Sequence, residues 1–510
     1  MISVLNSTAL CGLDGYIVDV ETDISNGMPG FDIVGLPDAA VKESKERIRA
    51  AIKNSGLVLP AKRITVNLAP ADIKKEGAHF DLPIALGILG ASEQLDADKC
   101  GNSIFLGELS LNGDLRRVSG VLPMVISAYQ KGIKTVFLPA DNAKEAAVVA
   151  GMEVYGVKSL KEILQHYTGE NILEPTMVDI DELLENSEKN KYDFADVKGQ
   201  LYVKRALEIA AAGGHNILMI GPPGSGKTMI AQRIPSILPD MTFEESLEVT
   251  KVHSIAGNLS NSSPLVAERP FRHPHHTVSA VGLTGGGANP KPGEISLSHN
   301  GVLFMDELPE FRRDALEAMR QPLEDGQVTI TRAGGSATYP CSVMMVASMN
   351  PCPCGYYGDK TRECTCSQTQ MMKYMSKISG PLLDRIDLHI EVPSVSYDDL
   401  ETKQRGESSA EIKARVNMAR KIQTNRYKGT GIFSNSQLTP ELMNKYCALG
   451  REANTLLKQA FESLGLSARA HNRILKVART IADLANSEHI QMEHIAEAIQ
   501  YRALDKKFFN

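Results

Sequence analysis

A glycine-rich string offers the clearest chemistry in the sequence: Gly221, Pro222, Pro223, Gly224, Ser225, Gly226, Lys227 and Thr228. It fits the pattern G-x-x-x-x-G-K-[ST] and follows an apolar segment, 216–220, that predicts a strand. Glycines let backbone N–H groups close around phosphate oxygens at the start of the next helix. Lys227 then reaches the β- and γ-phosphates, and the Thr228 hydroxyl binds Mg²⁺. The string predicts a nucleotide-binding phosphate loop; a chance glycine-rich loop is the alternative.

Two further predicted strands end in residues that suit hydrolysis. The apolar run 302–305 ends in Asp306 and Glu307, about 80 residues after the phosphate loop. An aspartate there holds the water shell of Mg²⁺, and the glutamate can polarise the attacking water. The strand 342–348 runs into Asn350, whose side chain would orient that water; a turn asparagine is the alternative.

Hydrolysis also needs a cation near the γ-phosphate. Arg385, in the segment 380–387, is one candidate, and Arg469, in the segment 466–471, is another. For each of them the alternative is an ordinary arginine exposed to solvent.

Four of the eight cysteines lie within fifteen positions: Cys352, Cys354, Cys364 and Cys366. Tetrahedral Zn²⁺ takes four soft ligands, and a loop of this size can close around one ion. The spacing is C-x-C rather than C-x-x-C, and Pro353 stiffens the first pair, so four reduced thiols are the alternative. His273, His275 and His276 predict a polar loop beside the nucleotide site rather than a second metal site.

Length and charge divide the chain into parts. At 510 residues, 43% hydrophobic and a net charge of −6, it predicts about three globular domains. Residues 1–169 mix strands and helices, and 170–195 form an acidic linker. Residues 196–393 alternate strand and helix, which is typical of a parallel α/β sheet. Residues 394–510 are helical and, from Glu401 onward, carry 18 basic and 11 acidic residues.

Composition also limits the location and the partners of the protein. No apolar run approaches the roughly 18 residues that span a bilayer, and the N-terminus has no basic signal-peptide region. We therefore expect a cytoplasmic protein with reduced thiols and no membrane partner. A net charge of −6 excludes a uniformly basic surface for nucleic acid, but not a local one.

The order of these segments resembles the AAA+ ATPases, in the clade of magnesium chelatase motor subunits and replicative MCM helicases. The sequence is still more similar to bacterial magnesium chelatase-like proteins of the ComM/YifB group, over essentially its whole length. The long matching strings are 35–44, 70–77, 271–277, 292–297 and 350–355. The resemblance implies an α/β fold, in which an AAA+ P-loop NTPase core is followed by a helical lid.

The resemblance also implies roles and partners. Asn350 matches sensor 1, Arg385 the arginine finger and Arg469 sensor 2, with Arg473 as the weaker choice for sensor 2. An arginine finger acts on the ATP of a neighbouring subunit, so a ring is implied, and proteins of this kind form hexamers. The implied function is ATP-driven branch migration of DNA in homologous recombination during natural transformation. The alternative is a magnesium chelatase-type motor subunit that remodels a partner protein complex.

A predicted hairpin and a predicted helix are candidates for binding DNA. In the related helicases a hairpin at the place of 327–339 points into the central pore, so Arg332 would meet DNA phosphates; a solvated hairpin is the alternative. Residues 285–293 resemble the helix-2 insert loop of this clade. A helix at 411–427 is a further candidate, with solubility as the alternative, because of these basic residues in and just after it: Lys413, Arg415, Arg420, Lys421, Arg426 and Lys428.

Residues 105–120 and 135–142 resemble the Lon protease domain, which has a ribosomal S5-like fold. Lon-type cleavage needs a serine that a nearby lysine activates. The positions aligned with that pair carry His79 and residues 122–124, which are Leu, Pro and Met. We therefore expect a non-proteolytic Lon-like N-terminal domain, and ATP-driven proteolysis is the alternative from another class of function.

Overall fold

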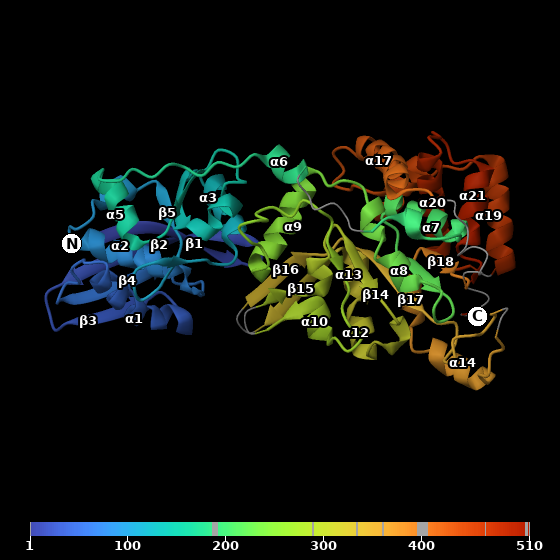
Figure 1. The fold of residues 1–510 in the computed structure, drawn as a ribbon, viewed down its shortest axis with the longest axis horizontal. Coiled ribbons are helices and arrows are strands. Elements are labelled where there is room, and N and C mark those ends of the chain that lie inside the picture. The colour runs from blue at the N-terminus through green and yellow to red at the C-terminus, as the bar shows by residue number, and fades with distance from the viewer. Residues whose placement is uncertain are drawn as a thin grey trace.

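The computed structural model describes residues 2–185, 192–287, 290–332, 335–359, 362–394, 406–464, 466–504 and 508. Figure 1 shows an elongated molecule. The N-terminal sheet, in blue, lies at one end and the C-terminal helices, in red, lie at the other. A second sheet with the helices around it lies between them.

The N-terminal part is built on a seven-stranded mixed sheet with the strand order β3-β4-β2-β1-β5-β8-β9. Its strands are β1 (Ile2–Cys11), β2 (Asp14–Ser25), β3 (Gly30–Val34), β4 (Arg63–Ala69), β5 (Ser103–Phe105), β8 (Thr135–Pro139) and β9 (Glu153–Val157). A short hairpin joins β6 (Glu108–Leu109) to β7 (Leu115–Arg116). The helices of this part are α1 (Ala39–Asn54), α2 (Asp81–Ala91), α3 (Val121–Gln130), α4 (Ala143–Ala146) and α5 (Leu160–Thr168).

Local signals explain two of these helices. Asp38 caps α1, because its carboxylate accepts a hydrogen bond of 2.8 Å from the Val41 backbone N–H. All eleven residues of α2 are buried, so this helix shows no polar face. In the segment that follows, predicted as an acidic linker, the described residues form the short helix α6 (Ile180–Glu185).

The second sheet has five parallel strands in the order β11-β14-β17-β10-β18. They are β10 (Ile217–Ile220), β11 (Phe271–Arg272), β14 (Val302–Met305), β17 (Met344–Met349) and β18 (Leu388–Glu391). The helices around it are α7 (Leu201–Gly213), α8 (Lys227–Ala231), α9 (Phe243–Ala256), α10 (Ala280–Thr284), α11 (Glu294–Leu297), α12 (Arg313–Ala318), α13 (Arg320–Asp325), α14 (Gln368–Met375) and α15 (Gly380–Leu383). Parallel strands end at the same edge of a sheet, so the segments after β10, β14 and β17 meet there.

Two hairpins extend from this α/β part. The first pairs β12 (Gly285–Gly286) with β13 (Lys291–Pro292). The second pairs β15 (Gln327–Arg332) with β16 (Gly335–Pro340), which confirms the hairpin predicted at 327–339. The side chain of Arg332 and residues 333–334 lie outside the described residues, so the DNA-binding role of Arg332 stays a prediction.

The C-terminal part consists of α17 (Ser409–Arg426), α18 (Pro440–Tyr446), α19 (Arg451–Leu464), α20 (Ala468–Leu484) and α21 (Met492–Gln500). These helices confirm the helical character predicted for the C-terminal part, and α17 matches the helix predicted at 411–427 to within a few residues. One continuous apolar cluster joins Val416 of α17 and Ile474 of α20 to Leu207 of α7 and Ile217 of β10. The C-terminal helices therefore share their core with the five-stranded sheet.

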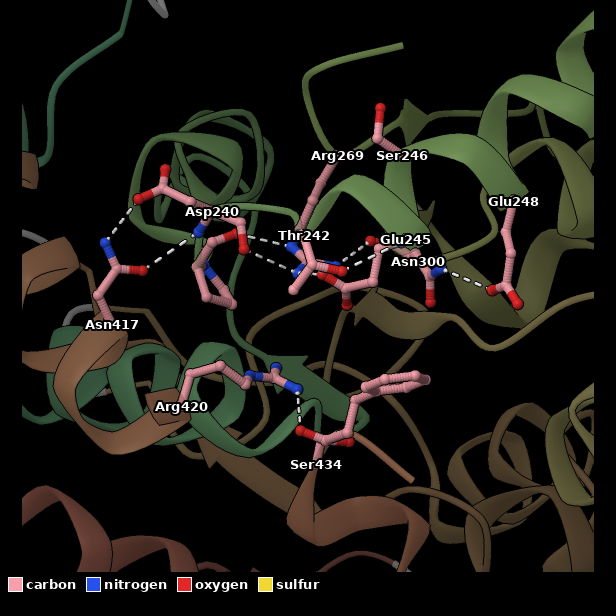
Figure 2. Close-up of polar contacts among 12 residues, drawn as sticks. Asp240, Thr242, Glu245, Ser246, Glu248, Arg269, Asn300, Asn417, Arg420 and Ser434 are labelled. Atoms are coloured by element: carbon pink, nitrogen blue, oxygen red, sulfur yellow. Dashed lines mark hydrogen bonds and ion pairs between the residues drawn. The ribbon is translucent and has the colours of Figure 1, made fainter. Parts of the chain in front are cut away.

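Polar contacts add to this junction between α17 and the α/β part (Figure 2). The Asn417 side chain donates to the Asp240 carboxylate at 2.8 Å, and Lys413 forms an ion pair with the same carboxylate at 2.7 Å. Arg420 points toward the segment at Ser434, where its Nη1 donates to the Phe433 carbonyl at 3.0 Å.

Arg415 and Arg426 of α17 are also engaged within the chain. Arg415 pairs with Glu208 and Glu407, and Arg426 pairs with Asp483 at 2.5 Å. Together with Lys413 and Arg420, these side chains are occupied by internal contacts, which argues against a phosphate-binding role for the four of them.

The N-terminal part contacts α9 and the second hairpin. The Ser254 hydroxyl donates to the Glu145 carboxylate at 2.5 Å, and the Gly120 backbone N–H donates to the Ser254 carbonyl at 2.9 Å. A Cβ added at Gly12 would lie 3.5 Å from the Cα of Ala337 in β16, so the β1–β2 turn packs against the hairpin. Within the described ranges, no helix combines the length and the apolar character needed to cross a membrane.

Candidate nucleotide-binding site

The predicted phosphate loop connects β10 to α8 at the carboxyl edge of the sheet. Two of its glycines show why the loop needs this residue. Gly226 has φ of +88°, in the left-handed region, at the start of α8. A Cβ at Gly221 would lie 2.2 Å from the Val392 carbonyl oxygen, so only glycine fits there. These glycines therefore let the loop turn tightly between β10 and the start of α8, the arrangement in which backbone N–H groups can bind phosphate.

Lys227 lies at the centre of this loop. Its Nζ donates to the Gly221 carbonyl at 2.7 Å and to the Pro222 carbonyl at 2.9 Å, and Asn350 Oδ1 lies at 3.3 Å. Burial lowers the pKa of Lys227 to about 8, while the charges of Asp306 and Glu307 act in the opposite direction. The structure thus brings Lys227 and Asn350, predicted from separate motifs, into direct contact.

Asp306, which directly follows β14, contacts both α8 and β17. Thr228 Oγ1 donates to one carboxylate oxygen of Asp306 at 2.7 Å, and the Ser348 hydroxyl donates to the other. A hydroxyl and a carboxylate are hard oxygen donors of the kind that Mg²⁺ takes, so Thr228 and Asp306 fit such an ion. Ser348 was not predicted; its position two residues before Asn350, on the same predicted strand, was the available signal.

Glu307 turns away from the end of β14 with a left-handed backbone, φ +55°. Its carboxylate is 59% exposed and lies 3.9 Å from Nδ1 of His276. The Glu307 backbone N–H donates to the Ser348 hydroxyl at 3.3 Å. The segment 273–276 was expected beside the nucleotide site; the structure shows in addition which histidine approaches Glu307.

The four clustered cysteines converge after β17. The Sγ atom of Cys352 lies 3.3 Å from that of Cys354 and 3.6 Å from that of Cys364. The Sγ atom of Cys366 completes the set, and all four Sγ atoms lie within 4.8 Å of one another. Four thiolates around a tetrahedral Zn²⁺ are separated by about 3.8 Å, so the cluster fits the ion that the spacing suggested.

This cysteine loop packs directly on the phosphate loop. A Cβ added at Gly355 would lie 2.5 Å from Cδ of Pro223. The backbone N–H of Tyr356 holds the pKa of the Cys354 thiol low, at about 5. The loop that carries the sulfur cluster therefore supports one wall of the nucleotide site.

The candidate arginines lie at the opposite end of the parallel strands, at the amino edge of the sheet. Arg385 and Asp387 precede β18, and β18 runs parallel to β10 with Leu388 beside Ile217. The phosphate loop follows the other end of β10, about 15 Å away at 3.3 Å per residue. The structure therefore does not bring Arg385 to the phosphate loop of its own chain.

Arg469 and Arg473 join Arg385 in a cavity of about 640 Å³ at that edge. Arg469 forms an ion pair with Asp384 at 3.5 Å, and Arg473 pairs with Asp387. Arg473 and His215 together keep the pKa of the Asp387 carboxyl well below its usual range, although burial acts in the opposite direction. Arg469 therefore lies beside Arg385 and away from the phosphate loop of its own chain, and its match to sensor 2 stays a prediction.

Comparison with known proteins agrees with these features. Three family models match the chain. They are described as "Subunit ChlI of Mg-chelatase" over residues 20–142, "Magnesium chelatase, subunit ChlI" over 193–400, and the C-terminal region of subunit ChlI over 406–502. Competence protein ComM of Haemophilus influenzae is 46% identical over 506 residues, 99% of this chain and 98% of that protein. The chain belongs to the magnesium chelatase-like family of ComM and YifB. YifB of Escherichia coli is 44% identical over 99% of this chain and 98% of that protein.

Membership of this magnesium chelatase-like family indicates an AAA+-type domain that uses ATP and Mg²⁺. A partial similarity extends to another family: Lon protease 2 of Bacillus subtilis is 24% identical over 182 residues, 32% of this chain and 32% of that protein. The predicted Lon resemblance is therefore supported over part of the chain.

Proposed function

We propose that this chain is an ATP hydrolase that assembles into a ring, a hexamer in this family, and moves along DNA. The observation that carries the proposal is the division of the catalytic groups between two edges of one sheet. The phosphate loop and the Asp306 strand end lie at one edge, and Arg385 lies at the other. A ring in which each subunit offers its arginine edge to the next subunit's phosphate loop completes every site.

Each side chain has a defined task in this proposal. Backbone N–H groups of the phosphate loop and Lys227 bind the phosphates of ATP, and Thr228 with Asp306 would hold Mg²⁺, which neutralises the charge that develops on the phosphate oxygens. Glu307 takes a proton from the attacking water, and Asn350 orients that water.

The arginines act on the neighbouring subunit. Arg385 stabilises the charge on the γ-phosphate of the adjacent site. Arg469, which lies beside Arg385 in the same cavity, acts as sensor 2 from the same direction. Both guanidinium groups would move onto phosphate oxygens when two subunits meet.

DNA is the proposed track. One support is the name of the related competence protein, which is 46% identical over nearly the whole chain. The other is the β15–β16 hairpin, whose Arg332 we propose as a phosphate contact. We assign the activity to branch migration in homologous recombination during natural transformation. The eight free thiols suit a reducing compartment, so we place it in the cytoplasm.

The second candidate is a motor subunit that remodels a partner protein complex. It is favoured by the family description, which names a magnesium chelatase subunit over residues 193–400. The two candidates differ in what stimulates the ATPase. We expect single-stranded or branched DNA to raise ATP turnover of the purified protein and the protein to displace a strand; turnover indifferent to DNA would favour the partner complex.

Two structural assignments complete the proposal. We assign one Zn²⁺ to the cysteine cluster, where it would hold the loop after β17 in place. We keep the division into 1–169, 170–195, 196–393 and 394–510, and propose a Lon-like fold without proteolytic activity for the first part. His79 supports the absence of proteolysis, because it is buried, its ring Nε2 lies 3.0 Å from the Thr8 carbonyl, and burial lowers its pKa to about 4.

A further inference from the structure

The guanidinium group of Arg385 is held by its own chain on two sides. Nη1 donates to the Pro381 carbonyl at 2.6 Å, and Nη2 donates to the Glu324 carboxylate. The Arg385 side chain is 11% exposed, whereas that of Glu324 is 56% exposed. The carboxylate is thus the accessible half of the pair.

Three other arginines lie close enough to Arg385 to act on its charge. Burial, followed by the charges of Arg469, Arg320 and Arg473, lowers the pKa of Arg385. The neighbouring carboxylates are engaged elsewhere: Glu317 pairs with Arg320 at 2.5 Å, and Asp384 pairs with Arg469. Within the described part of the chain, Glu324 is the carboxylate that contacts Arg385 directly.

Glu324 is also connected to the second hairpin. It lies in α13, which ends at Gly326 with φ +66°, and β15 begins at the next residue. The Gly326 carbonyl accepts a hydrogen bond of 2.8 Å from the Cys341 backbone N–H at the far end of β16. The buried Cys341 thiol also donates to the Pro322 carbonyl at 3.5 Å. The base of the hairpin and the carboxylate that holds Arg385 therefore belong to one hydrogen-bonded unit.

We infer that Glu324 is a positioning residue that retains Arg385 on its own subunit and couples its release to the β15–β16 hairpin. A displacement of the hairpin base carries α13 with it, separates the two side chains and leaves the guanidinium available to the neighbouring ATP. The inference rests on the proposed function, because it assumes that Arg385 acts on the next subunit.

Glu324→Gln tests this inference, because it keeps the shape of the side chain and removes its charge. A partly exposed ion pair shifts the equilibrium between paired and separated side chains by a factor of about two to five. We therefore expect the variant to raise kcat for ATP without DNA about two- to fivefold, with KM unchanged. Stimulation by single-stranded DNA, as a ratio, should fall by the same factor, and Glu324→Asp should restore it in part.

Asp325→Asn is the matched control. Asp325 is the next residue of α13 and lines the same cavity, but it accepts a hydrogen bond from Gln321 at 3.0 Å. The Asp325→Asn substitution removes the same charge at nearly the same place and should leave kcat at the wild-type value. An unchanged or lower kcat in Glu324→Gln, or an equal rise in Asp325→Asn, would overturn the inference.

The outcome is separable from the proposed function. Absence of DNA stimulation in the wild type would contradict the DNA proposal, but the kcat of Glu324→Gln without DNA would still decide the role of Glu324. Normal hydrolysis by Arg385→Ala would instead remove Arg385 from the mechanism, and the inference with it.

Discussion

At the scale of single residues, the nucleotide site separates binding from hydrolysis. Lys227 contacts the loop carbonyls that phosphates would displace, whereas Glu307 is exposed and hydrogen-bonds through its backbone. We expect Lys227→Ala to lose ATP binding. Glu307→Gln should bind ATP normally and hydrolyse it at least about 10²-fold more slowly, as for loss of a general base. A fluorescent ATP analogue and phosphate release measure the two effects; normal turnover in Glu307→Gln would exclude Glu307 from the mechanism.

The burial of Lys227 predicts a pH dependence of ATP affinity. Its pKa of about 8 means that the ammonium loses its proton in the ATP-free protein above pH 8, and binding ATP must then take the proton back. Affinity should therefore fall as pH rises through 8, by up to about tenfold for each pH unit. Calorimetry between pH 7 and 9, in buffers of different ionisation enthalpy, measures the affinity and the proton uptake.

Lys227→Arg provides the comparison, because a guanidinium keeps its charge over this range. Its ATP affinity, even if lower at pH 7, should not change between pH 7 and 9. A wild-type affinity that is equally constant, without proton uptake, would contradict the lowered pKa of Lys227.

At the scale of elements, the cysteine loop is predicted to support the phosphate loop. Anaerobically purified protein should contain about one zinc per chain if all four thiols are ligands. Cys364→Ser should lose the metal and weaken ATP binding, because the loop that carries Gly355 would no longer be held against Pro223. Cys11→Ser changes an exposed thiol outside the cluster and should alter neither quantity. Protein without zinc on elemental analysis would leave the alternative of four reduced thiols.

The contact between the two loops can be tested without changing a cysteine. Gly355→Ala should weaken ATP binding, because the added Cβ would lie 2.5 Å from Pro223, in addition to the cost of a left-handed backbone. Gly431→Ala is the matched control: φ is +75° there and nothing lies within 4 Å of the added atom. Both variants carry similar backbone strain, so a difference in their ATP affinities reports on the contact with Pro223. Equal ATP affinities in the two variants, measured by titration, would contradict a role of this contact in ATP binding.

Several elements could be predicted because their signals are patterns along the chain. The phosphate loop, the strand that runs into Asn350 and the C-terminal helices depend on spacing within about twenty residues. The strand end at Asp306 was recognised from its place about 80 residues after the phosphate loop. The contact of Ser348 with Asp306 depends instead on β14 lying beside β17, a pairing that the spacing of the residues does not encode. The approach of His276 to Glu307 likewise joins segments about 30 residues apart.

The basic residues of α17 illustrate the same limit. The sequence shows a row of cations, which suits either phosphate binding or solvent exposure. Their acidic partners, Asp240, Glu208 and Asp483, lie between about 60 and 210 residues away along the chain. Only the fold shows that Lys413 and Arg415 hold α17 to the α/β part, whereas Arg426 holds it to α20.

At the scale of the whole molecule, we propose that the two ends of the parallel strands in the five-stranded sheet carry complementary halves of one catalytic site. The carboxyl edge holds the phosphate loop with Asp306 and Glu307, and the opposite edge holds Arg385. One chain cannot bring both halves together, since the strands between them are parallel and keep them apart. Activity should therefore depend on assembly, and specific ATPase activity should rise with protein concentration over the range in which rings form.

Mixing two inactive variants tests this division directly. Arg385→Ala should bind ATP nearly normally and lose hydrolysis by a factor on the order of 10³ or more, as for other arginine fingers. Lys227→Ala has an intact arginine edge but no working phosphate loop. Rings mixed from the two contain some interfaces in which an intact loop meets an intact arginine, so ATPase activity should return on mixing. Lys227→Ala mixed with Glu307→Gln supplies the control, because both changes damage the same half and no interface can be complete. If mixed rings form but neither mixture recovers activity, each chain must complete its own site, and Arg385 would not be the residue that completes its neighbour's.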